Sequence, residues 1–342
     1  MKLWTSRCVT RRGFFHTLAA GALTLGGGCS GRGRGAELLH ASFDATRELY
    51  RKINQAFAEH RQQQGQEPVR IKMSHGGSGA QARAVLDGLP AHVVSLALWL
   101  DIDTIVRKGL IEPSWESQFP HRSLPYISTV VFVVRQGNPW NIRDWPDLLQ
   151  DQLRIVTANP KTSGGARLNM LAAWLSVTAR GGSFPEAKDF LTRLLRKVPV
   201  LDSGARGAAL TFARKGIGDV LLTWENEAYL QQRELRGRVE IVHPPLSVQA
   251  EPPVAVVHAN ARQAGAEELA HNYIRFLYSP VAQNIIAEQY LRPVHWTEDP
   301  RFTPMQLLRP VDPQHQLGDW HNIQKQFFAE GGLIDQIFRE IS

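Results

Sequence analysis

Four short segments rich in glycine, serine and alanine lie where a predicted strand ends and a predicted helix begins. Their sequences are SFDAT (residues 42–46), SHGGSG (74–79), KTSGGA (161–166) and DSGARG (202–207). The first backbone N–H groups of such a helix have no acceptor inside the helix, and the helix dipole adds about half a positive charge at this end. Small side chains leave these N–H groups accessible, and serine adds a hydroxyl donor. Because parallel strands end at the same edge of a sheet, the four segments predict one anion site that needs no lysine or arginine.

One of these segments also fits two other motifs. Residues 77–82 match the G-x-G-x-x-A fingerprint of dinucleotide sites, with Asp101 about twenty residues further on. This match keeps an exported, dinucleotide-dependent oxidoreductase open as an alternative. Residues 76–80 differ at one position from the nucleophile-elbow motif. The adjacent His75 is badly placed as a base, however, and the motif offers no acid partner. Neither glycine-rich segment is followed by Gly-Lys-Ser or Gly-Lys-Thr, which excludes a P-loop.

Short apolar runs alternate with amphipathic stretches through most of the chain, which predicts an α/β protein with mostly parallel sheets covered by helices. Two apolar strands, within residues 125–134 and 251–257, each follow proline, which fixes the entry of the chain and excludes a helix. We interpret them as crossovers between two lobes, joined as a two-strand hinge. The first lobe then comprises residues 36–128 and 254–342, and the second comprises residues 129–253. A ligand would lie in the cleft between the lobes.

The first 29 residues have the pattern of a signal peptide. The run TRRGFF (residues 10–15) resembles a twin-arginine export signal, and a modestly apolar stretch follows it. The glycines before Cys29 resemble a lipobox, although the aliphatic Leu25 stands four residues before the cysteine rather than three. Two outcomes stay open. Cys29 is lipidated and tethers the protein to the membrane, or ordinary signal peptidase cleaves the chain near this point. Residues 30–35 are rich in glycine and arginine and predict a flexible tether.

The formal net charge of +7 comes almost entirely from the start of the chain. Six basic residues and no acidic one precede Ala36, so the remainder is close to neutral, which argues against a nucleic-acid-binding surface. The two cysteines, Cys8 and Cys29, both lie in the predicted signal region, so the core must stabilise the protein without a disulfide. The twelve histidines show no H-E-x-x-H or similar spacing, and we expect no metal site and no cofactor.

Several motifs, in matching order and spacing, resemble those of the bacterial sulfate-binding protein family. They are LLHASFD (38–44), SHGGSG (74–79), NPKTSGGAR (159–167), LDSGARG (201–207) and GDVLLTWENE (218–227). The similarity continues at AEPPVAVV (250–257), YSP (278–280) and FAEGG (328–332), so it covers about residues 37–340. It implies a type II periplasmic-binding fold with two α/β lobes that close on sulfate. It also implies a receptor for an ABC importer rather than an enzyme.

The resemblance implies a ligand shell made mostly of backbone groups. The implied sulfate-binding residues are Asp44, Ser78, Ser163, Gly164, Gly165, Ala205 and Trp224. Ser78 would offer its N–H with its hydroxyl as a further donor, Ser163 its hydroxyl, and Trp224 its indole N–H, which can only donate. Asp44 would present its N–H and turn its carboxylate away from the anion. Arg167 and Arg206 stand close by, and we expect them to form salt bridges outside this shell.

Such a donor set predicts a preference for sulfate over phosphate. A fully ionised sulfate needs only donors, whereas phosphate at neutral pH carries a proton that needs an acceptor, and leaving that proton unpaired costs roughly 1–3 kcal/mol. Gly77, Gly165, Ala205 and Trp224 follow the sulfate-type pattern of the family, with a thiosulfate-preferring receptor open as an alternative. We expect a periplasmic monomer whose partners are ABC permease subunits of the inner membrane.

Overall fold

The computed structural model describes residues 36–315 and 317–342, which belong to one unit of the chain. The predicted signal peptide, with Cys29, and the tether at residues 30–35 lie outside the described residues. Among the helices that are described, none is long and apolar enough to cross a membrane.

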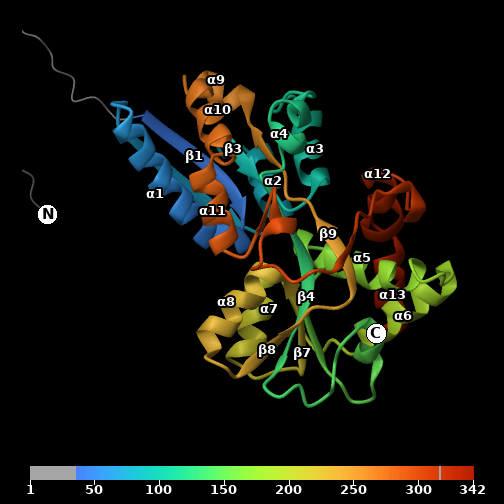
Figure 1. Ribbon diagram of the computed structural model, residues 1–342. Coiled ribbons are helices and arrows are strands. Elements are labelled where there is room, and N and C mark those ends of the chain that lie inside the picture. The colour runs from blue at the N-terminus through green and yellow to red at the C-terminus, as the bar shows by residue number, and fades with distance from the viewer. Residues whose placement is uncertain (1–35, 316) are drawn as a thin grey trace, which may run out of the picture. The chain divides into compact units, whose positions relative to one another are not determined.

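The first sheet has four strands in the order β10-β3-β1-β2. Two of its three pairings are parallel, β1 with β2 and β1 with β3, while β10 runs antiparallel to β3. The strands are β1 (Ala36–Phe43), β2 (Val69–Gly76), β3 (Val93–Ser95) and β10 (Val254–Val256). The helices that follow or cover them are α1 (Arg47–Gln63), α2 (Ser78–Leu86), α3 (Trp99–Arg107), α4 (Pro120–Ser123), α9 (His258–Gln263), α10 (Glu267–Phe276) and α11 (Pro280–Glu288) (Figure 1).

The second sheet has the order β12-β9-β4-β7-β5-β6, with β8 and β11 also paired to β4. Its strands are β4 (Tyr126–Arg135), β5 (Ile155–Ala158), β6 (Leu201–Asp202), β7 (Val220–Trp224), β8 (Val239–Val242), β9 (Leu246–Ala250), β11 (Arg292–Pro293) and β12 (Gln306–Leu308). Its helices are α5 (Gly164–Thr178), α6 (Phe184–Arg196), α7 (Ala205–Ala213), α8 (Glu225–Leu235), α12 (Trp320–Ile323) and α13 (Leu333–Ile341).

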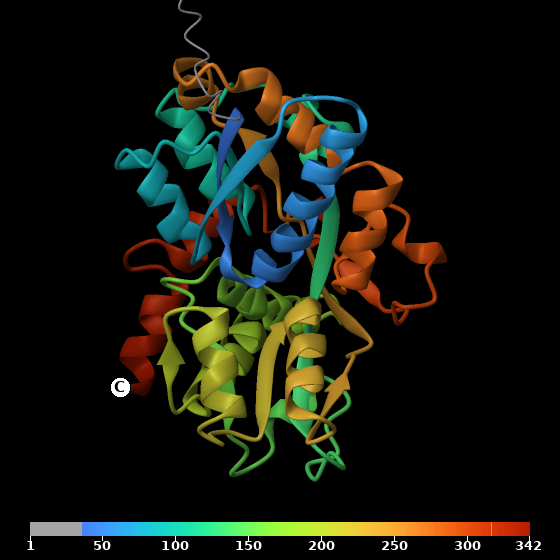
Figure 2. The ribbon, with the colours of Figure 1, turned by 90° about the vertical axis from the view of Figure 1, so that its left-hand side faces the viewer.

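The expectation of mostly parallel sheets holds for the first sheet and is wrong for the second. β4 is antiparallel to β7, β8, β9 and β11, and only three pairings of this sheet are parallel. The physical reason is the route of the chain. β4 enters from the first lobe, so it runs against the strands of the β–α–β units beside it (Figure 2).

Two adjacent strands connect the two sheets. β4 begins at Tyr126, directly after Pro125, and β9 leads through Pro252 and Pro253 into β10 of the first sheet. β4 and β9 pair antiparallel at Ser128 with Ala250 and at Thr129 with Gln249. The chain therefore crosses between the sheets on paired strands, as the proline-led apolar runs predict.

The last segment of the chain packs differently from the expectation that residues 254–342 all belong to the first lobe. β12 pairs parallel with β9 in the second sheet. The apolar face of α13 joins the core cluster that contains Trp174 and Leu191 of the second lobe, and Figure 1 shows α13 beside α6. The apolar face of an amphipathic helix indicates that the helix packs against another element, but it does not identify that element. The hydrophobic pattern of α13 therefore could not predict that it packs in the second lobe.

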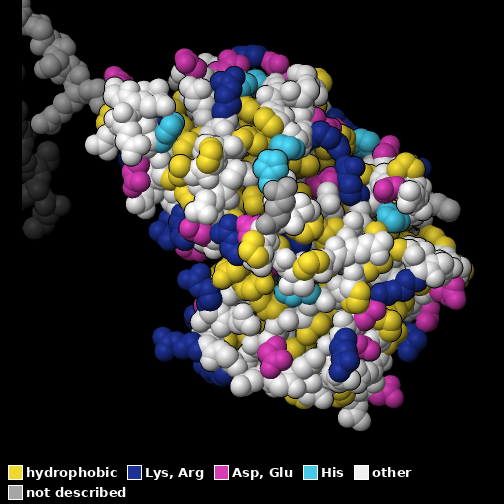
Figure 3. Space-filling model, viewed as in Figure 1, with side chains coloured by type: hydrophobic (Ala, Val, Ile, Leu, Met, Phe, Trp, Pro, Cys, Tyr) yellow, Lys and Arg dark blue, Asp and Glu magenta, His cyan; other side chains and the backbone are white. Residues whose placement is uncertain are grey.

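β4 is apolar from Val130 to Val134 because both of its faces are buried there. Val130, Phe132 and Val134 point into one core cluster of the second lobe, and Val131 and Val133 point into the other. Successive strand residues face opposite sides, so a strand covered by helices on both faces must be apolar throughout. On the face drawn in Figure 3, the lysine and arginine side chains are distributed widely, in keeping with the near-neutral charge of the body.

A buried ion pair lies next to the hinge. Both carboxylate oxygens of Glu225, the first residue of α8, accept hydrogen bonds from Arg292 of β11, at 2.7 and 2.8 Å, and neither side chain is exposed. His243 approaches the same carboxylate at 3.1 Å. Burial alone would raise the pKa of Glu225, but the hydrogen bonds from His243 and Arg292 outweigh it and hold that pKa below its usual value. The pair ties the helix that follows Trp224 to the strand that touches the start of β4.

Replacing Arg292 by Met should destabilise the fold strongly, because the buried carboxylate of Glu225 would lose both hydrogen bonds from Arg292 and keep only its contact with His243. We expect a loss of about 3–5 kcal/mol in the free energy of unfolding, measured by urea titration. The control is Arg51→Met, which removes the exposed pair with Glu48 and should cost at most about 1 kcal/mol. Equal stability of the two variants would contradict this role of Arg292.

Candidate functional site

A small cavity lies where strand ends of the first sheet meet helix starts of the second lobe. All seven residues predicted to bind the anion line it. The lining residues are Phe43, Asp44, Ala45, Gly77, Ser78, Ala97, Ser163, Gly164, Gly165, Gly204, Ala205 and Trp224. Its volume is about 20 Å³, which suits a small group and leaves no room for a dinucleotide.

The four glycine- and serine-rich segments do converge, as their sequences predict. α2 begins at Ser78, α5 at Gly164 and α7 at Ala205, while Asp44 opens the short helical turn Asp44–Thr46 that precedes α1. Each of these residues is the first of its helix, so its backbone N–H has no acceptor within that helix. The cavity is therefore walled by backbone donors that have no acceptor within their own helices, at the positive ends of helix dipoles.

Trp224 provides the clearest sign of a ligand-binding site. It ends β7, it is 2% exposed, and its indole nitrogen is buried without a hydrogen-bond partner among the described residues. The ring packs against Phe43 of the first sheet, with the centroids 5.2 Å apart. A buried donor left unpaired costs roughly 1–3 kcal/mol. The cavity beside the indole is where an acceptor from outside the chain would relieve that cost.

Ser163 caps α5 and still has a proton to donate. Its Oγ accepts the N–H of Ala166 at 3.3 Å, which uses one lone pair of the oxygen and leaves the O–H directed elsewhere. Gly164 and Gly165 follow it with their own N–H groups, and the side chain of Ser163 is buried. Three donors of the second lobe thus come from consecutive residues.

The hydroxyl of Ser78 differs from the expectation. Its Oγ accepts the N–H of Ala97 at 2.8 Å and donates to the carboxylate of Asp101. The proton of this hydroxyl is therefore already engaged, so the hydroxyl is not a further donor to the anion, and Ser78 faces the cavity with its backbone N–H. Asp101 is buried in the first turn of α3 and orients Ser78.

Asp101 is the functional residue whose role the sequence missed. The sequence considers it only as the acidic residue of a dinucleotide fingerprint, whereas the structure engages it with Ser78. Burial raises the pKa of Asp101, and the hydrogen bond from Ser78 and the charge of Arg167 act in the opposite direction. The sequence signal for this role is an acidic residue in the first turn of a helix that follows a strand. The spacing of Asp101 along the chain does not identify Ser78 as its partner.

Glycines at the cavity allow the two lobes to touch. A Cβ on Gly164 would lie 3.2 Å from the Cβ atoms of both Ala97 and Ser78, which belong to the first lobe. A Cβ on Gly204 would lie 3.2 Å from Oδ2 of Asp44. Asn226 adds a direct link between the lobes, because its Nδ2 donates to the carbonyl of Ala45 at 2.8 Å. The small residues therefore serve close contact between the lobes as well as access to backbone N–H groups.

A second, larger cavity of about 160 Å³ adjoins the first at Asp44 and Ala45. It contains the charged side chains that the first lacks, including Arg47, Arg206 and Glu227. Burial raises the pKa of Asp44, partly offset by the charges of Arg47 and Arg206, and burial raises the pKa of Glu227 to about 7. The basic side chains thus gather beside the small cavity rather than inside it.

The two arginines predicted outside the ligand shell make different contacts. Arg206 lies 3.7 Å from the carboxylate of Glu234, as a salt bridge of the expected kind. Arg167 instead donates to the carbonyl of Pro160 at 3.1 Å and to Oε1 of Gln324 at 3.4 Å. Neither arginine lines the small cavity.

Comparison with known proteins places the chain in a family. The family described as "Bacterial extracellular solute-binding protein" matches residues 38–292. The sulfate-binding protein of Escherichia coli is 45% identical over 306 residues, which cover 88% of this chain and 92% of the relative. The thiosulfate-binding protein of Pseudomonas aeruginosa is 42% identical over 333 residues, which cover 96% and 99%.

Solved structures agree on the fold. The sulfate-binding protein SubI from Mycobacterium tuberculosis superposes with a TM-score of 0.74 at 30% identity, covering 86% of this chain and 99% of that one. The periplasmic binding protein AfuA from Actinobacillus pleuropneumoniae matches with a TM-score of 0.64 at 16% identity, over 89% and 97% of the two chains. The predicted two-lobed periplasmic-binding fold is confirmed. The chain belongs to the bacterial extracellular solute-binding protein family, in the group that contains these sulfate- and thiosulfate-binding proteins.

Proposed function

We propose that this protein binds sulfate in the small cavity beside Trp224 and delivers it to an ABC importer. The observation that carries the proposal is the indole N–H of Trp224, a buried donor that borders the cavity and has no partner among the described residues. The names of the related proteins support the same ligand class.

Selectivity in this proposal comes from the kind of hydrogen-bonding groups, not from opposite charge. The lining residues that would face the anion offer N–H groups and the hydroxyl of Ser163, and no lysine or arginine is among them. Asp44 is the one acidic residue of the wall, and Oδ2 of its carboxylate lies against Gly204. A fully ionised oxyanion matches such a wall, whereas a protonated phosphate would leave its own donor unpaired at a cost of roughly 1–3 kcal/mol.

We propose sulfate rather than thiosulfate as the preferred ligand. Thiosulfate replaces one oxygen of sulfate with a larger sulfur atom, which is a weaker acceptor. The cavity is narrow at the point where this would matter, because a Cβ on Gly165 would already lie 3.1 Å from the indole nitrogen of Trp224. Both ligand types occur among the names of the relatives, so thiosulfate is the alternative that a titration must separate.

Export and partners complete the proposal. The twin-arginine pattern and the following stretch would direct the chain to the periplasm, with Cys29 either lipidated or removed with the signal peptide. The receptor would act as a monomer, hold no cofactor and contact permease subunits in the inner membrane. An extracellular solute-binding family supports this location and this transport role.

Isothermal titration of the protein with sodium sulfate tests the function. We expect one site with a dissociation constant in the micromolar range or below, a weaker response to thiosulfate, and binding of phosphate at neutral pH that is weaker by about 5- to 150-fold. NADH is the matched probe for the oxidoreductase alternative and should give no heat. Absence of heat with sulfate at tens of micromolar would refute the proposed receptor.

The change Trp224→Phe keeps the aromatic packing against Phe43 but removes the indole donor. We expect sulfate affinity to fall at least about tenfold, because one buried hydrogen bond to a charged ligand is lost. The control is Trp145→Phe, which also removes a buried indole hydrogen bond, here to the carbonyl of Leu246 at 2.8 Å, outside the cavity lining. Equal affinities of these two variants would show that Trp224 only fills space.

The change Gly164→Val should block contact between the lobes, since its side chain would collide with Ala97 and Ser78. We expect sulfate affinity to fall by more than about tenfold, with Gly164→Ala intermediate. The control Ala179→Val lies at the exposed end of the same helix and should bind sulfate normally. Thermal unfolding of all variants separates loss of binding from loss of fold. Normal affinity of a folded Gly164→Val would overturn the requirement for close contact.

A further inference from the structure

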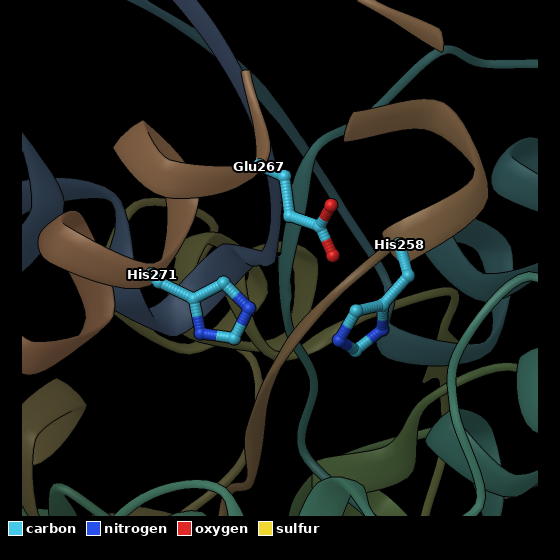
Figure 4. Close-up of side chains that lie close together, drawn as sticks. All are labelled: His258, Glu267 and His271. Atoms are coloured by element: carbon cyan, nitrogen blue, oxygen red, sulfur yellow. The ribbon is translucent and has the colours of Figure 1, made fainter. Parts of the chain in front are cut away.

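Three side chains that could hold a metal ion converge on the first lobe, away from the anion cavity. His258, Glu267 and His271 each direct one possible ligand atom toward the others, and these atoms all lie within 4.8 Å of one another. Figure 4 shows the two imidazole rings facing each other with the carboxylate beside them. None of the three lines either cavity described above.

Two helices of the fold bring these residues together. His258 is the first residue of α9, which begins one residue after β10 ends, and Glu267 is the first residue of α10. His271 lies four positions after Glu267, so both project from the same face of α10 about one turn apart. The sequence predicts no metal site because it shows no H-E-x-x-H spacing. His258 comes from a separate helix, α9, and only the packing of α9 against α10 brings it beside the other two residues.

Neighbouring residues hold the three side chains in place. The ring of His271 packs against Phe119, with the centroids 5.5 Å apart. His258 is buried and its ring contacts the amide of Gln118 at 3.2 Å and the backbone N–H of Glu112 at 3.4 Å. Arg262 donates to both carboxylate oxygens of Glu267, at 3.0 and 3.1 Å. The contact with Arg262 orients the carboxylate of Glu267, whereas both ring nitrogens of His258 face donors, so a metal ion would take the place of one of these two contacts.

We propose that His258, Glu267 and His271 form a binding site for a divalent metal ion of the Zn²⁺ class. Two imidazole nitrogens and one carboxylate oxygen are a ligand set that Zn²⁺ accepts, with water in the fourth position. Ligand atoms around tetrahedral zinc are about 3.3 Å apart, so the three groups must draw together by roughly an ångström, which side-chain rotation can supply. Glu267 and His271 also line a surface hollow, which gives the ion a route to the site.

Titration of the full chain with zinc chloride tests this proposal, the chloride salt being used because sulfate is itself a proposed ligand. We expect one Zn²⁺ per chain and a loss of at least about tenfold in affinity for His271→Ala. Glu267→Gln keeps the shape of the side chain but removes its negative charge, and it should also weaken Zn²⁺. His60→Ala, which removes a histidine of α1 from outside the cluster, should bind Zn²⁺ normally.

The outcomes are distinct. No heat with zinc chloride, or unchanged affinity in His271→Ala, would overturn the site. If His60→Ala loses as much affinity as His271→Ala, the binding is general to surface histidines and the site is equally overturned. A sulfate titration of each variant checks the fold independently, because the metal ligands do not line the anion cavity, and sulfate affinity should remain at the wild-type value.

Discussion

An anion that leaves water for a protein must replace its hydrogen bonds to water with hydrogen bonds to protein donors. This need explains which groups line the small cavity. The fold meets this need in two ways. Three helices, α2, α5 and α7, begin at the cavity, so their first N–H groups have no acceptor within the helix. The indole of Trp224 is also buried there without a partner among the described residues. No formal positive charge lines the cavity. Arg47 and Arg206 lie in the adjoining cavity, where the carboxylates of Asp44 and Glu227 accompany them.

Contact between the lobes is the second condition, and it follows from the first. Donors from both lobes reach one small ion only if backbones approach closely, and the glycines at 164, 165 and 204 make that approach possible. The hinge strands β4 and β9 cross side by side, so the lobes meet along a defined line. The buried pair of Glu225 and Arg292 then fixes the helix that follows Trp224 beside this hinge.

Much of the fold and most of the site could be predicted, because their signals are local. Gly, Ser and Ala at strand-to-helix turns indicate open helix starts, and proline before an apolar run indicates a crossover strand. The parts that were missed depend on distant partners. The apolar face of α13 does not reveal that it packs in the second lobe, the direction of β4 follows from the path of the chain, and the carboxylate of Asp101 engages Ser78 only because α3 begins beside α2.

A crystal structure of the sulfate complex tests the central claim most directly. The account predicts sulfate in the small cavity, with one oxygen within about 3 Å of the indole nitrogen of Trp224 and others facing the N–H groups of Ser78, Gly164 and Ala205. The hydroxyl of Ser78 should remain bonded to Asp101. Sulfate held instead by Arg47 and Arg206 in the larger cavity would contradict recognition by neutral donors.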